Sequence, residues 1–438
     1  MSLHELTIDR LALGGSGVGR LNGKVCFVPF SAPGDGLKVR IEREHRSYCE
    51  AELVELVEPS PVRTAPVCPV FGQCGGCSLQ HISYDEQCRA KQQQLYETLQ
   101  RIAKIADPPV SATVAAADQY GYRARAQFKL HNTIQGLAVG FYRRGSRFVI
   151  DLPHGCPVVT PAINQAISRL RSILQQVPDR DRIPQVSLEE GIDGVVAIIH
   201  YIGADAAALV ERLLAGRDQL ELAGLFLQTG RKDSLQQVYG SGVLQYAVPA
   251  CGADGTDLQL QYGIGGFSQV NRQQNRTMIS LVCSAAQPAG NHRLLDLFCG
   301  NGNLSLPMAA HLQDLYGVEG FAPSLASAVD NAGQLHVNNS TFNCLSAESA
   351  VVELLQVRAQ FDTVVLDPPR AGAAELMRML PRLAAERIIY VSCDPATLAR
   401  DLAILCGGTG YCLVQATPLD MFPQTGHLET VALLQQDR

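Results

Sequence analysis

The amino-acid sequence predicts an α/β fold in the C-terminal part of the chain, preceded by a small β-barrel and a central α+β region. From about residue 266, short apolar runs alternate with helical segments, which is typical of a parallel sheet covered by helices on both faces. Before residue 60, short alternating segments are separated by Gly and Pro clusters, which is typical of a small barrel. We therefore predict three domains, residues 1–60, 61–265 and 266–438.

The N-terminal domain is expected to consist of short strands joined by turns such as Gly14–Gly17 and Pro33–Gly36. The expected strands are Glu5–Asp9, Lys24–Phe30, Leu37–Glu44 and Cys49–Val57. A Pro-rich linker follows, then a loop that holds several cysteines, and then a polar helix expected over Tyr84–Ile105. The central domain is expected to contain further strands and a helix near Ala206–Leu214.

The composition narrows the class of protein. The 438 residues include 36 Lys and Arg against 42 Asp and Glu, a net charge of −6, which argues against a general polyanion binder. No run of about 18 apolar residues occurs, so no membrane span is expected, and the N-terminus lacks a secretory pattern. We therefore expect a cytoplasmic protein. In that reducing compartment, grouped members of its 14 cysteines more often bind metal or do chemistry than form disulfides.

The C-terminal domain carries the features of a nucleoside-cofactor site. Its expected apolar strands are Leu294–Phe298, Leu315–Val318, Thr363–Leu366 and Arg387–Val391. The first runs into the turn Gly300-Asn301-Gly302, where glycines allow close approach of a ligand, and a helix is expected next. Glu319 ends the second strand, where a carboxylate can bind ribose hydroxyls, and Asp367 ends a later one. Ser305 replaces the third Gly of a dinucleotide fingerprint, which favours S-adenosylmethionine over NAD. The alternative is a purely structural Gly turn.

A cysteine at a strand end is the candidate nucleophile. Cys393 is followed by Asp394, a good N-cap, and by Pro395, a good first helical residue, so a helix is expected to begin there. A thiol at a helix N-terminus is expected to have a lowered pKa and more thiolate character. The alternative is a buried structural cysteine.

Two further segments fit chemistry on a base. The turn Asp367–Arg370 is similar to that of amino-group methyltransferases, but Arg370 stands where those enzymes have an aromatic residue, so amino-group methylation is the poorer interpretation. Glu429, beside His427 in a tight turn, is either a solvated charge or a base. A thiolate that adds to carbon 6 of uracil activates carbon 5 toward a methyl donor, and a base must then remove the carbon-5 proton. Cys393 and Glu429 fill these two roles.

Three motifs make the chain resemble the RNA uracil-5-methyltransferases, which modify 23S ribosomal RNA or transfer RNA. Ser392–Asp401 looks like the nucleophile motif, Gly426–Glu429 like the base motif, and Gly266–Asn271 like the Gln-Val-Asn segment. The resemblance covers nearly the whole chain and implies a class I (Rossmann-like) methyltransferase domain that uses S-adenosylmethionine. It also implies catalytic roles for Cys393 and Glu429, and cofactor contacts from Gln269, Phe298, Gly300, Asn303, Glu319 and Asp367.

A group of cysteines predicts a metal centre. Cys68, Cys74 and Cys77 lie within ten residues, and Cys156 is the candidate fourth ligand. Four thiolates suit either zinc or an iron–sulfur cluster, and their spacing does not decide between them. Unliganded thiols are the alternative. The family resemblance implies a [4Fe–4S] cluster at these four positions.

RNA contacts are expected from four segments. The first domain resembles a TRAM (OB-like) RNA-binding barrel, whose turn Gly17–Arg20 and basic strand Lys38–Arg46 would contact phosphates. In the central domain, Tyr120–Arg125 and Phe141–Arg147 interleave aromatics with arginines, a mix that stacks on unpaired bases and holds phosphates. The alternative is strands with a solvated charged face. Since the target must leave its stack, an unpaired or loop uridine is expected.

The expected function is formation of 5-methyluridine in 23S ribosomal RNA, because the barrel and the cysteine group together resemble the ribosomal branch of the family. The same reaction on transfer RNA is one alternative, since some archaeal relatives share this architecture. An inactive RNA-binding or assembly factor is the other, and the intact Cys393 and Glu429 argue against it. No obligatory protein partner is expected.

Overall fold

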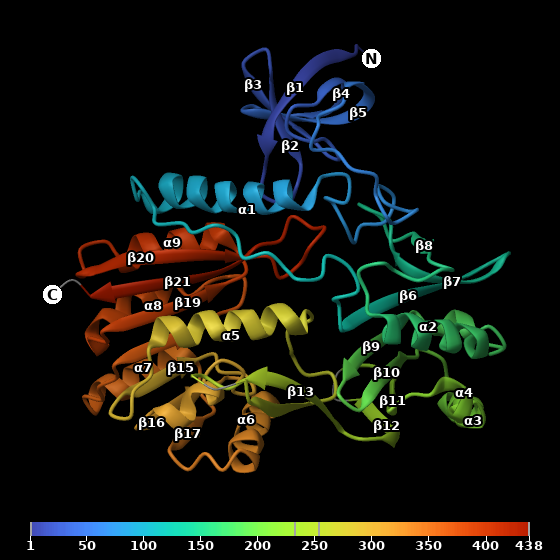
Figure 1. The fold of residues 1–438 in the computed structure, drawn as a ribbon. Coiled ribbons are helices and arrows are strands. Elements are labelled where there is room, and N and C mark those ends of the chain that lie inside the picture. The colour runs from blue at the N-terminus through green and yellow to red at the C-terminus, as the bar shows by residue number, and fades with distance from the viewer. Residues whose placement is uncertain (1, 232–233, 253–254, 437–438) are drawn as a thin grey trace.

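The computed structural model describes residues 2–231, 234–252 and 255–436. A small barrel sits on top of two larger bodies that lie side by side, the C-terminal sheet and the central sheet (Figure 1). Within the described part of the chain, no helix is long and apolar enough to cross a bilayer.

The N-terminal barrel is closed and has the strand order β1-β2-β3-β5-β4. Its strands are β1 His4–Leu11, β2 Gly17–Leu21, β3 Lys24–Val28, β4 Gly36–Glu44 and β5 Tyr48–Glu58. The four predicted strands are present, but the prediction of a turn at Gly17–Arg20 was wrong, because this segment forms most of β2. Its glycines serve close packing instead. A Cβ at Gly17 would overlap Ser31, and one at Gly19 would overlap the backbone oxygen of Thr7.

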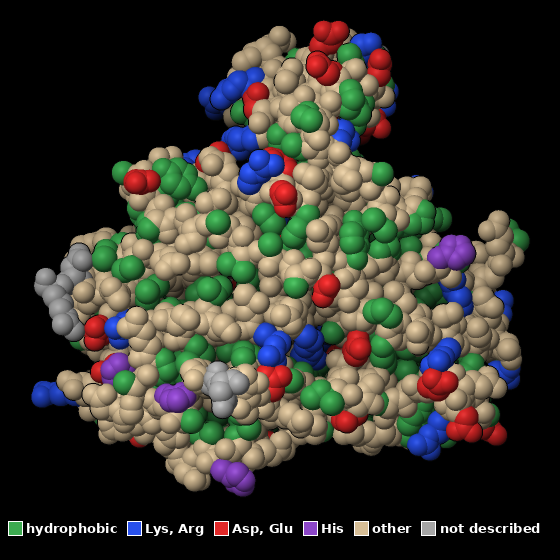
Figure 2. Space-filling model, viewed as in Figure 1, with side chains coloured by type: hydrophobic (Ala, Val, Ile, Leu, Met, Phe, Trp, Pro, Cys, Tyr) green, Lys and Arg blue, Asp and Glu red, His purple; other side chains and the backbone are tan. Residues whose placement is uncertain are grey.

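The basic strand β4 faces an acidic neighbour. Lys38 pairs with Glu55 at 2.9 Å, and Arg40 pairs with Glu52, both on β5. Figure 2 accordingly shows Lys and Arg interspersed with Asp and Glu over the barrel. A phosphate that binds this strand therefore has to compete with glutamates already in place.

Helix α1 (Tyr84–Thr98) joins the cysteine loop to the C-terminal sheet and continues as one π-helical turn, η1 (Leu99–Ala103). The helix predicted over Tyr84–Ile105 is thus confirmed. On its inner side, Lys91 Nζ lies 2.6 Å from Asp420 Oδ1, and both side chains are fully buried. This ion pair ties α1 to the segment that leads into the last strand.

The central sheet has seven strands in the order β12-β11-β10-β9-β6-β7-β8. They are β6 Arg125–Thr133, β7 Gly136–Tyr142, β8 Val149–Asp151, β9 Gln185–Gly191, β10 Gly194–His200, β11 Gly224–Gln228 and β12 Leu235–Gly240. Helices α2 (Pro161–Leu174), α3 (Ala206–Ala215) and α4 (Arg217–Leu220) pack on one face. The helix predicted near Ala206–Leu214 is confirmed. The hairpin β13 (Val243–Pro249) and β14 (Asp257–Gly263) links this sheet to the next body.

The C-terminal sheet has the order β17-β16-β15-β18-β19-β21-β20. Its strands are β15 Arg293–Leu297, β16 Asp314–Val318, β17 Ser340–Asn343, β18 Thr363–Leu366, β19 Arg387–Ser392, β20 Tyr411–Leu419 and β21 Glu429–Gln436. The first five are parallel, as predicted, and β21 runs antiparallel to both β19 and β20.

Both faces of this sheet are buried. Val364 and Leu366 point into one core and Val365 into the other, which explains the continuous apolar strands. Helices α5 (Arg272–Ala286) and α6 (Ala322–Gln334) cover one face, and α7 (Ala347–Gln356), α8 (Ala374–Met379) and α9 (Pro395–Leu405) cover the other.

The helix expected after the Gly-rich turn is only the short 3₁₀ helix η4 (Leu306–His311). Pro307 has no N–H to donate, and Met308 N donates to Ser305 O at 3.0 Å, a bond of the tighter i→i+3 kind.

The Lys91–Asp420 pair gives a stability prediction. Lys91→Met should lower the free energy of unfolding by roughly 3–5 kcal/mol, because it leaves Asp420 buried without its cation. The double variant Lys91→Met/Asp420→Leu should lose clearly less, since no unpaired charge remains. Urea unfolding followed by circular dichroism measures both. An equal loss in the two variants would contradict this account.

Candidate active site

A cavity of about 760 Å³ lies at the carboxyl edge of the C-terminal sheet. Four of its lining residues each directly follow one of four neighbouring parallel strands: Phe298 after β15, Glu319 after β16, Asp367 after β18 and Cys393 after β19. Ligands bind at this edge in such sheets. All the residues chosen from the sequence for catalysis or cofactor binding line this one cavity: Gln269, Phe298, Gly300, Asn303, Glu319, Asp367, Cys393 and Glu429.

The turn after β15 is held in a special backbone conformation. Phe298, Gly300 and Gly302 have φ values of 68°, 57° and 84°, in the left-handed region. The carboxylate of Glu319 accepts a hydrogen bond from Gly300 N at 3.1 Å and another from Phe321 N at 2.7 Å. Glu319 therefore fixes the turn as well as facing the cavity.

An amide network that was not predicted from the sequence supports the same turn. Asn275 and Asn303 exchange two hydrogen bonds of 2.9 Å, and Tyr246 OH lies 3.1 Å from Asn303 Oδ1. Asn301 donates to Tyr246 OH at 2.9 Å. Tyr246 comes from β13 and Asn275 from α5, so no local pattern in the sequence connects them to the turn.

The segment that carries Gln269 crosses from the hairpin to α5. Ala124 N donates to Val270 O at 2.7 Å, and Arg125 donates to Gly266 O at 2.6 Å. The central domain thus places one wall of the cavity.

Three carboxyl groups line the cavity: Asp296 and Glu429 are buried, and Asp367 is half-buried. Burial raises the pKa of Asp296 to about 7 and that of Asp367 to about 7. Burial, with the charge of Asp367, raises the pKa of Glu429 well above its usual range, while Arg370 opposes this shift. Asp296 was not among the predicted site residues. The three groups together make a cavity that favours a cationic ligand.

The thiol of Cys393 is half-buried in the same cavity. The predicted cap is confirmed: the Asp394 carboxylate accepts hydrogen bonds from Ala396 N at 3.0 Å and Thr397 N at 2.9 Å. The prediction of a lowered thiol pKa was wrong for the free protein. Burial raises the pKa of Cys393, the charges of Glu429 and Asp367 add to the rise, and Arg370 opposes it. Asp394 takes up the free N–H groups of α9 that were expected to act on the thiol.

The loop before Glu429 is held by residues from distant parts of the chain. Ser78 N and Leu79 N each donate to Gln424 O at 3.0 Å, and Gly426 N donates to Ser78 Oγ at 3.1 Å. Ser78 directly follows Cys77, so the cysteine loop packs against the loop that leads to Glu429.

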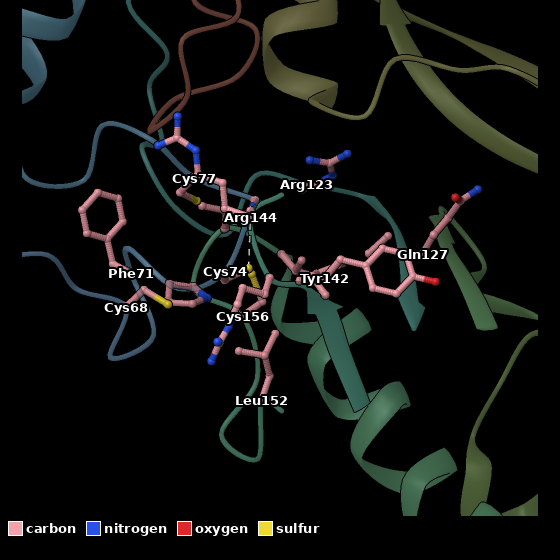
Figure 3. A pocket seen from close by; sticks show the side chains of 18 of the residues that line it. Cys68, Phe71, Cys74, Cys77, Arg123, Gln127, Tyr142, Arg144, Leu152 and Cys156 are labelled. Carbon is pink, nitrogen blue, oxygen red and sulfur yellow. Dashed lines mark hydrogen bonds between the residues drawn. The ribbon is translucent and has the colours of Figure 1, made fainter. Parts of the chain in front are cut away.

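The four predicted cysteine ligands line a second cavity, of about 920 Å³ (Figure 3). Burial, together with charges on Cys77, Cys68 and Cys74, raises the pKa of Cys156 to about 12. However, among the described residues no three or more His, Cys, Asp or Glu side chains form a group that could hold a metal ion. The structure therefore does not show the predicted metal site in its described residues: the four cysteines share a cavity but form no ligand shell.

The predicted RNA-contact segments of the central domain border the cysteine cavity. Arg123, Tyr142 and Arg144 line it, and Figure 3 shows Arg144 beside the cysteines. The cysteine cavity also shares Phe267, Ser268 and Val270 with the active-site cavity. The two cavities thus adjoin along the Gln269 segment.

The sequence was compared with known proteins. Residues 83–437 match the family described as tRNA (Uracil-5-)-methyltransferase, and residues 3–54 match the TRAM domain. A 23S rRNA (uracil(1939)-C(5))-methyltransferase RlmD of Legionella pneumophila is 34% identical over 98% of this chain and 96% of its own. The enzyme of the same name from Thiobacillus denitrificans is 34% identical over 98% of this chain and 99% of its own.

A solved structure is similar over nearly the whole chain. It is the Pyrococcus abyssi tRNA (uracil-54, C5)-methyltransferase in complex with S-adenosyl-L-homocysteine, 25% identical, with a TM-score of 0.74 and coverage of 98% of this chain and 100% of that one. The family match and the full-length relatives agree with the cavity geometry. The chain belongs to the tRNA (uracil-5-)-methyltransferase family and carries an N-terminal TRAM domain.

Proposed function

We propose that this protein transfers a methyl group from S-adenosylmethionine to carbon 5 of an unpaired uridine in 23S ribosomal RNA, forming 5-methyluridine in the cytosol. The observation that carries the proposal is that Cys393 and Glu429 line one cavity with the six proposed cofactor residues. The names of the full-length relatives favour ribosomal RNA. Transfer RNA is the second candidate substrate, because the structure of the Pyrococcus abyssi tRNA (uracil-54, C5)-methyltransferase is similar over 98% of this chain.

The cofactor would be held by residues from both walls of the cavity. Glu319, at the end of β16, is placed for the ribose hydroxyls, and Phe298 and Gly300 form the turn beneath the nucleoside. When bound, S-adenosylmethionine supplies a methyl group on a positively charged sulfur. Asp296, which is buried, and Asp367, which is half-buried, line the cavity and would give that charge a favourable environment.

The catalytic residues would act on the two carbons of one double bond. Cys393 Sγ forms a bond to carbon 6 of uracil, and the electron pair moves toward the carbonyl at carbon 4. Arg370 lines the cavity beside the thiol and is placed to donate to that oxygen as negative charge develops. Carbon 5 would then take the methyl group as the bond from methyl to the sulfonium sulfur breaks, which leaves S-adenosylhomocysteine. Glu429 would remove the carbon-5 proton, the electron pair of that bond would re-form the double bond between carbons 5 and 6, and Cys393 would leave as a thiolate.

Charge explains how the thiol would be activated. In the free protein the pKa of Cys393 and the pKa of Glu429 are both raised, so each group gives up its proton less readily than it does in water. A cationic sulfur near the carboxyls lowers the pKa of each group that it faces. Cofactor binding would thereby favour the thiolate needed for attack.

The substrate prediction is tested with labelled S-adenosylmethionine and unmodified RNA. Purified protein should form 5-methyluridine in 23S ribosomal RNA and none in transfer RNA, as measured by nuclease digestion and nucleoside chromatography. If 5-methyluridine formed in transfer RNA alone, the proposed reaction would stand and the proposed ribosomal substrate would be wrong. Absence of 5-methyluridine from both RNAs would overturn the proposed function.

The two catalytic roles predict different defects in variants of Cys393 and Glu429. Cys393→Ala should abolish methylation and leave no covalent protein–RNA complex, because no sulfur attacks carbon 6. Glu429→Gln should slow turnover by at least about 100-fold and accumulate a methylated covalent complex that resists denaturing electrophoresis. Cys88→Ala, on α1 outside both cavities, is the control that keeps turnover. A covalent complex in Cys393→Ala would exclude this thiol as the nucleophile.

The raised thiol pKa predicts the pH dependence of alkylation. A thiol pKa above its ordinary value of 9.0 leaves little thiolate at neutral pH, so iodoacetamide labelling of Cys393 in the free protein should keep rising beyond pH 9. At neutral pH, S-adenosylmethionine should speed the labelling of Cys393. S-adenosylhomocysteine, whose sulfur carries no charge, should not. Mass spectrometry of the Cys393 peptide measures both. A plateau near pH 7 would contradict the electrostatic account.

We also propose that Cys68, Cys74, Cys77 and Cys156 hold a [4Fe–4S] cluster. The support is that four thiols from separate segments line one cavity of about 920 Å³, a donor set used for such clusters. Their present arrangement forms no group that could hold a metal ion, so loading has to draw the thiols inward. Because Ser78 bonds to the loop before Glu429, such a cluster would brace that loop and take no part in methyl transfer.

Metal analysis tests this ligand set. Protein purified without oxygen should contain about four iron atoms and four sulfides per chain. Cys156→Ser should lose most of this iron, while Cys88→Ser keeps it. Stoichiometric zinc in place of iron, or unchanged iron in Cys156→Ser, would contradict the assignment.

A further inference from the structure

A third cavity, of about 290 Å³, opens on the face of the central sheet that α2 and α3 leave uncovered. Four neighbouring strands each contribute a polar side chain to it: Gln127 from β6, Ser187 from β9, His200 from β10 and Gln228 from β11. Their apolar neighbours on the same strands point into the core on the other face. None of these four residues was among the predicted site residues.

Strand register places these side chains in rows. Gln127 pairs with Ser187 across β6 and β9, and His200 pairs with Gln228 across β10 and β11. Gln185 bonds to Ser187 Oγ at 3.0 Å and to His200 Nε2 at 3.0 Å, and Ser187 Oγ lies 3.1 Å from that nitrogen. The imidazole is therefore held in one orientation at the floor of the cavity.

The cavity carries a few polar groups on a mostly apolar wall and is almost uncharged. Among the described residues that line it, Arg125 is the one with a full charge, and it already contacts Glu189 at 3.0 Å and Gly266 O at 2.6 Å. Burial lowers the pKa of His200, and the charge of Lys129 lowers it further, so the ring is neutral. Amide, hydroxyl and neutral imidazole groups match the donors and acceptors of a nucleobase edge better than they match a phosphate.

The position of the cavity links it to the reaction. It shares Phe321 and Ser324 with the active-site cavity, and Arg125 and Gln127 with the cysteine cavity. Phe321 is half exposed at the shared boundary and offers an aromatic face for stacking. In Figure 3, Gln127 points away from the cysteines, on the side opposite Cys68.

We propose that this cavity is a second base site, which takes one unpaired nucleobase of the RNA close to the target uridine. The proposal rests on the proposed function, since it assigns part of the RNA specificity of the same enzyme to the open face of the central sheet. The carboxamides of Gln127 and Gln228 read the edge of the base, and His200 and Ser187 contact it from below.

The test is a double-mutant cycle between protein and RNA. Abasic nucleotides are placed in turn at each unpaired position that flanks the target, and kcat/KM for 5-methyluridine formation is measured. The proteins are the wild type, Gln127→Ala/Gln228→Ala, and the control Gln356→Ala, an exposed glutamine at the far end of α7. Melting temperatures of the three proteins are measured in parallel.

One abasic position should lower kcat/KM of the wild type and of the control by about 10-fold, the value of one good base contact. The double variant should lose about the same factor with intact RNA, and the abasic RNA should cost it nothing more. Two outcomes would overturn the base site and leave the proposed function standing. One is full activity of the double variant on intact RNA. The other is that, at every abasic position, the loss of kcat/KM from the RNA change multiplies the loss from the protein change. Failure of the wild type to methylate intact RNA would instead overturn the proposed function.

Discussion

The register of one sheet is the constraint on which the rest of the site depends. Phe298, Glu319, Asp367 and Cys393 follow four adjacent parallel strands, so main-chain pairing alone makes them neighbours. The antiparallel strand β21 begins at Glu429 and pairs Thr430 with Ser392, the residue before Cys393. A carboxyl group and a thiol far apart in the sequence are thereby placed beside each other by backbone hydrogen bonds, which side-chain motion does not disturb.

The same geometry brings three carboxyl groups into one region, and this affects their pKa values. Asp296, Asp367 and Glu429 line one cavity, and their removal from water raises the pKa of all three, as it does that of Cys393. In the free protein these groups therefore give up their protons less readily than they do in water. Under the proposed function, a cationic methyl donor would oppose these shifts and favour the thiolate. The raised pKa of the thiol in the free protein would limit unwanted alkylation or oxidation of the cysteine.

The loop before Glu429 depends on the whole chain. Gly426 packs so closely on the backbone of Gly14 in the barrel that a Cβ there would overlap it. Gln87 on α1 donates to Gln424 Oε1 at 3.0 Å and accepts from Gln424 N at 3.1 Å. The barrel, the cysteine loop and α1 thus fix one short segment of the methyltransferase domain. The TRAM domain is in this way mechanically connected to the proposed base.

The sequence by itself determined the alternation of strands and helices, the N-cap at Asp394, and the identity of the residues around the main cavity. These are local signals: periodicity, capping and motifs written in consecutive residues. Only the tertiary structure decided what depends on neighbours far apart in the chain. In the tertiary structure the glycines of β2 allow close packing, and the pKa of Cys393 is raised where a lowered value was expected. Tyr246 and Asn275, from distant parts of the chain, lie at the cofactor turn. Burial and electrostatic fields are sums over residues from every domain, and no stretch of sequence contains them.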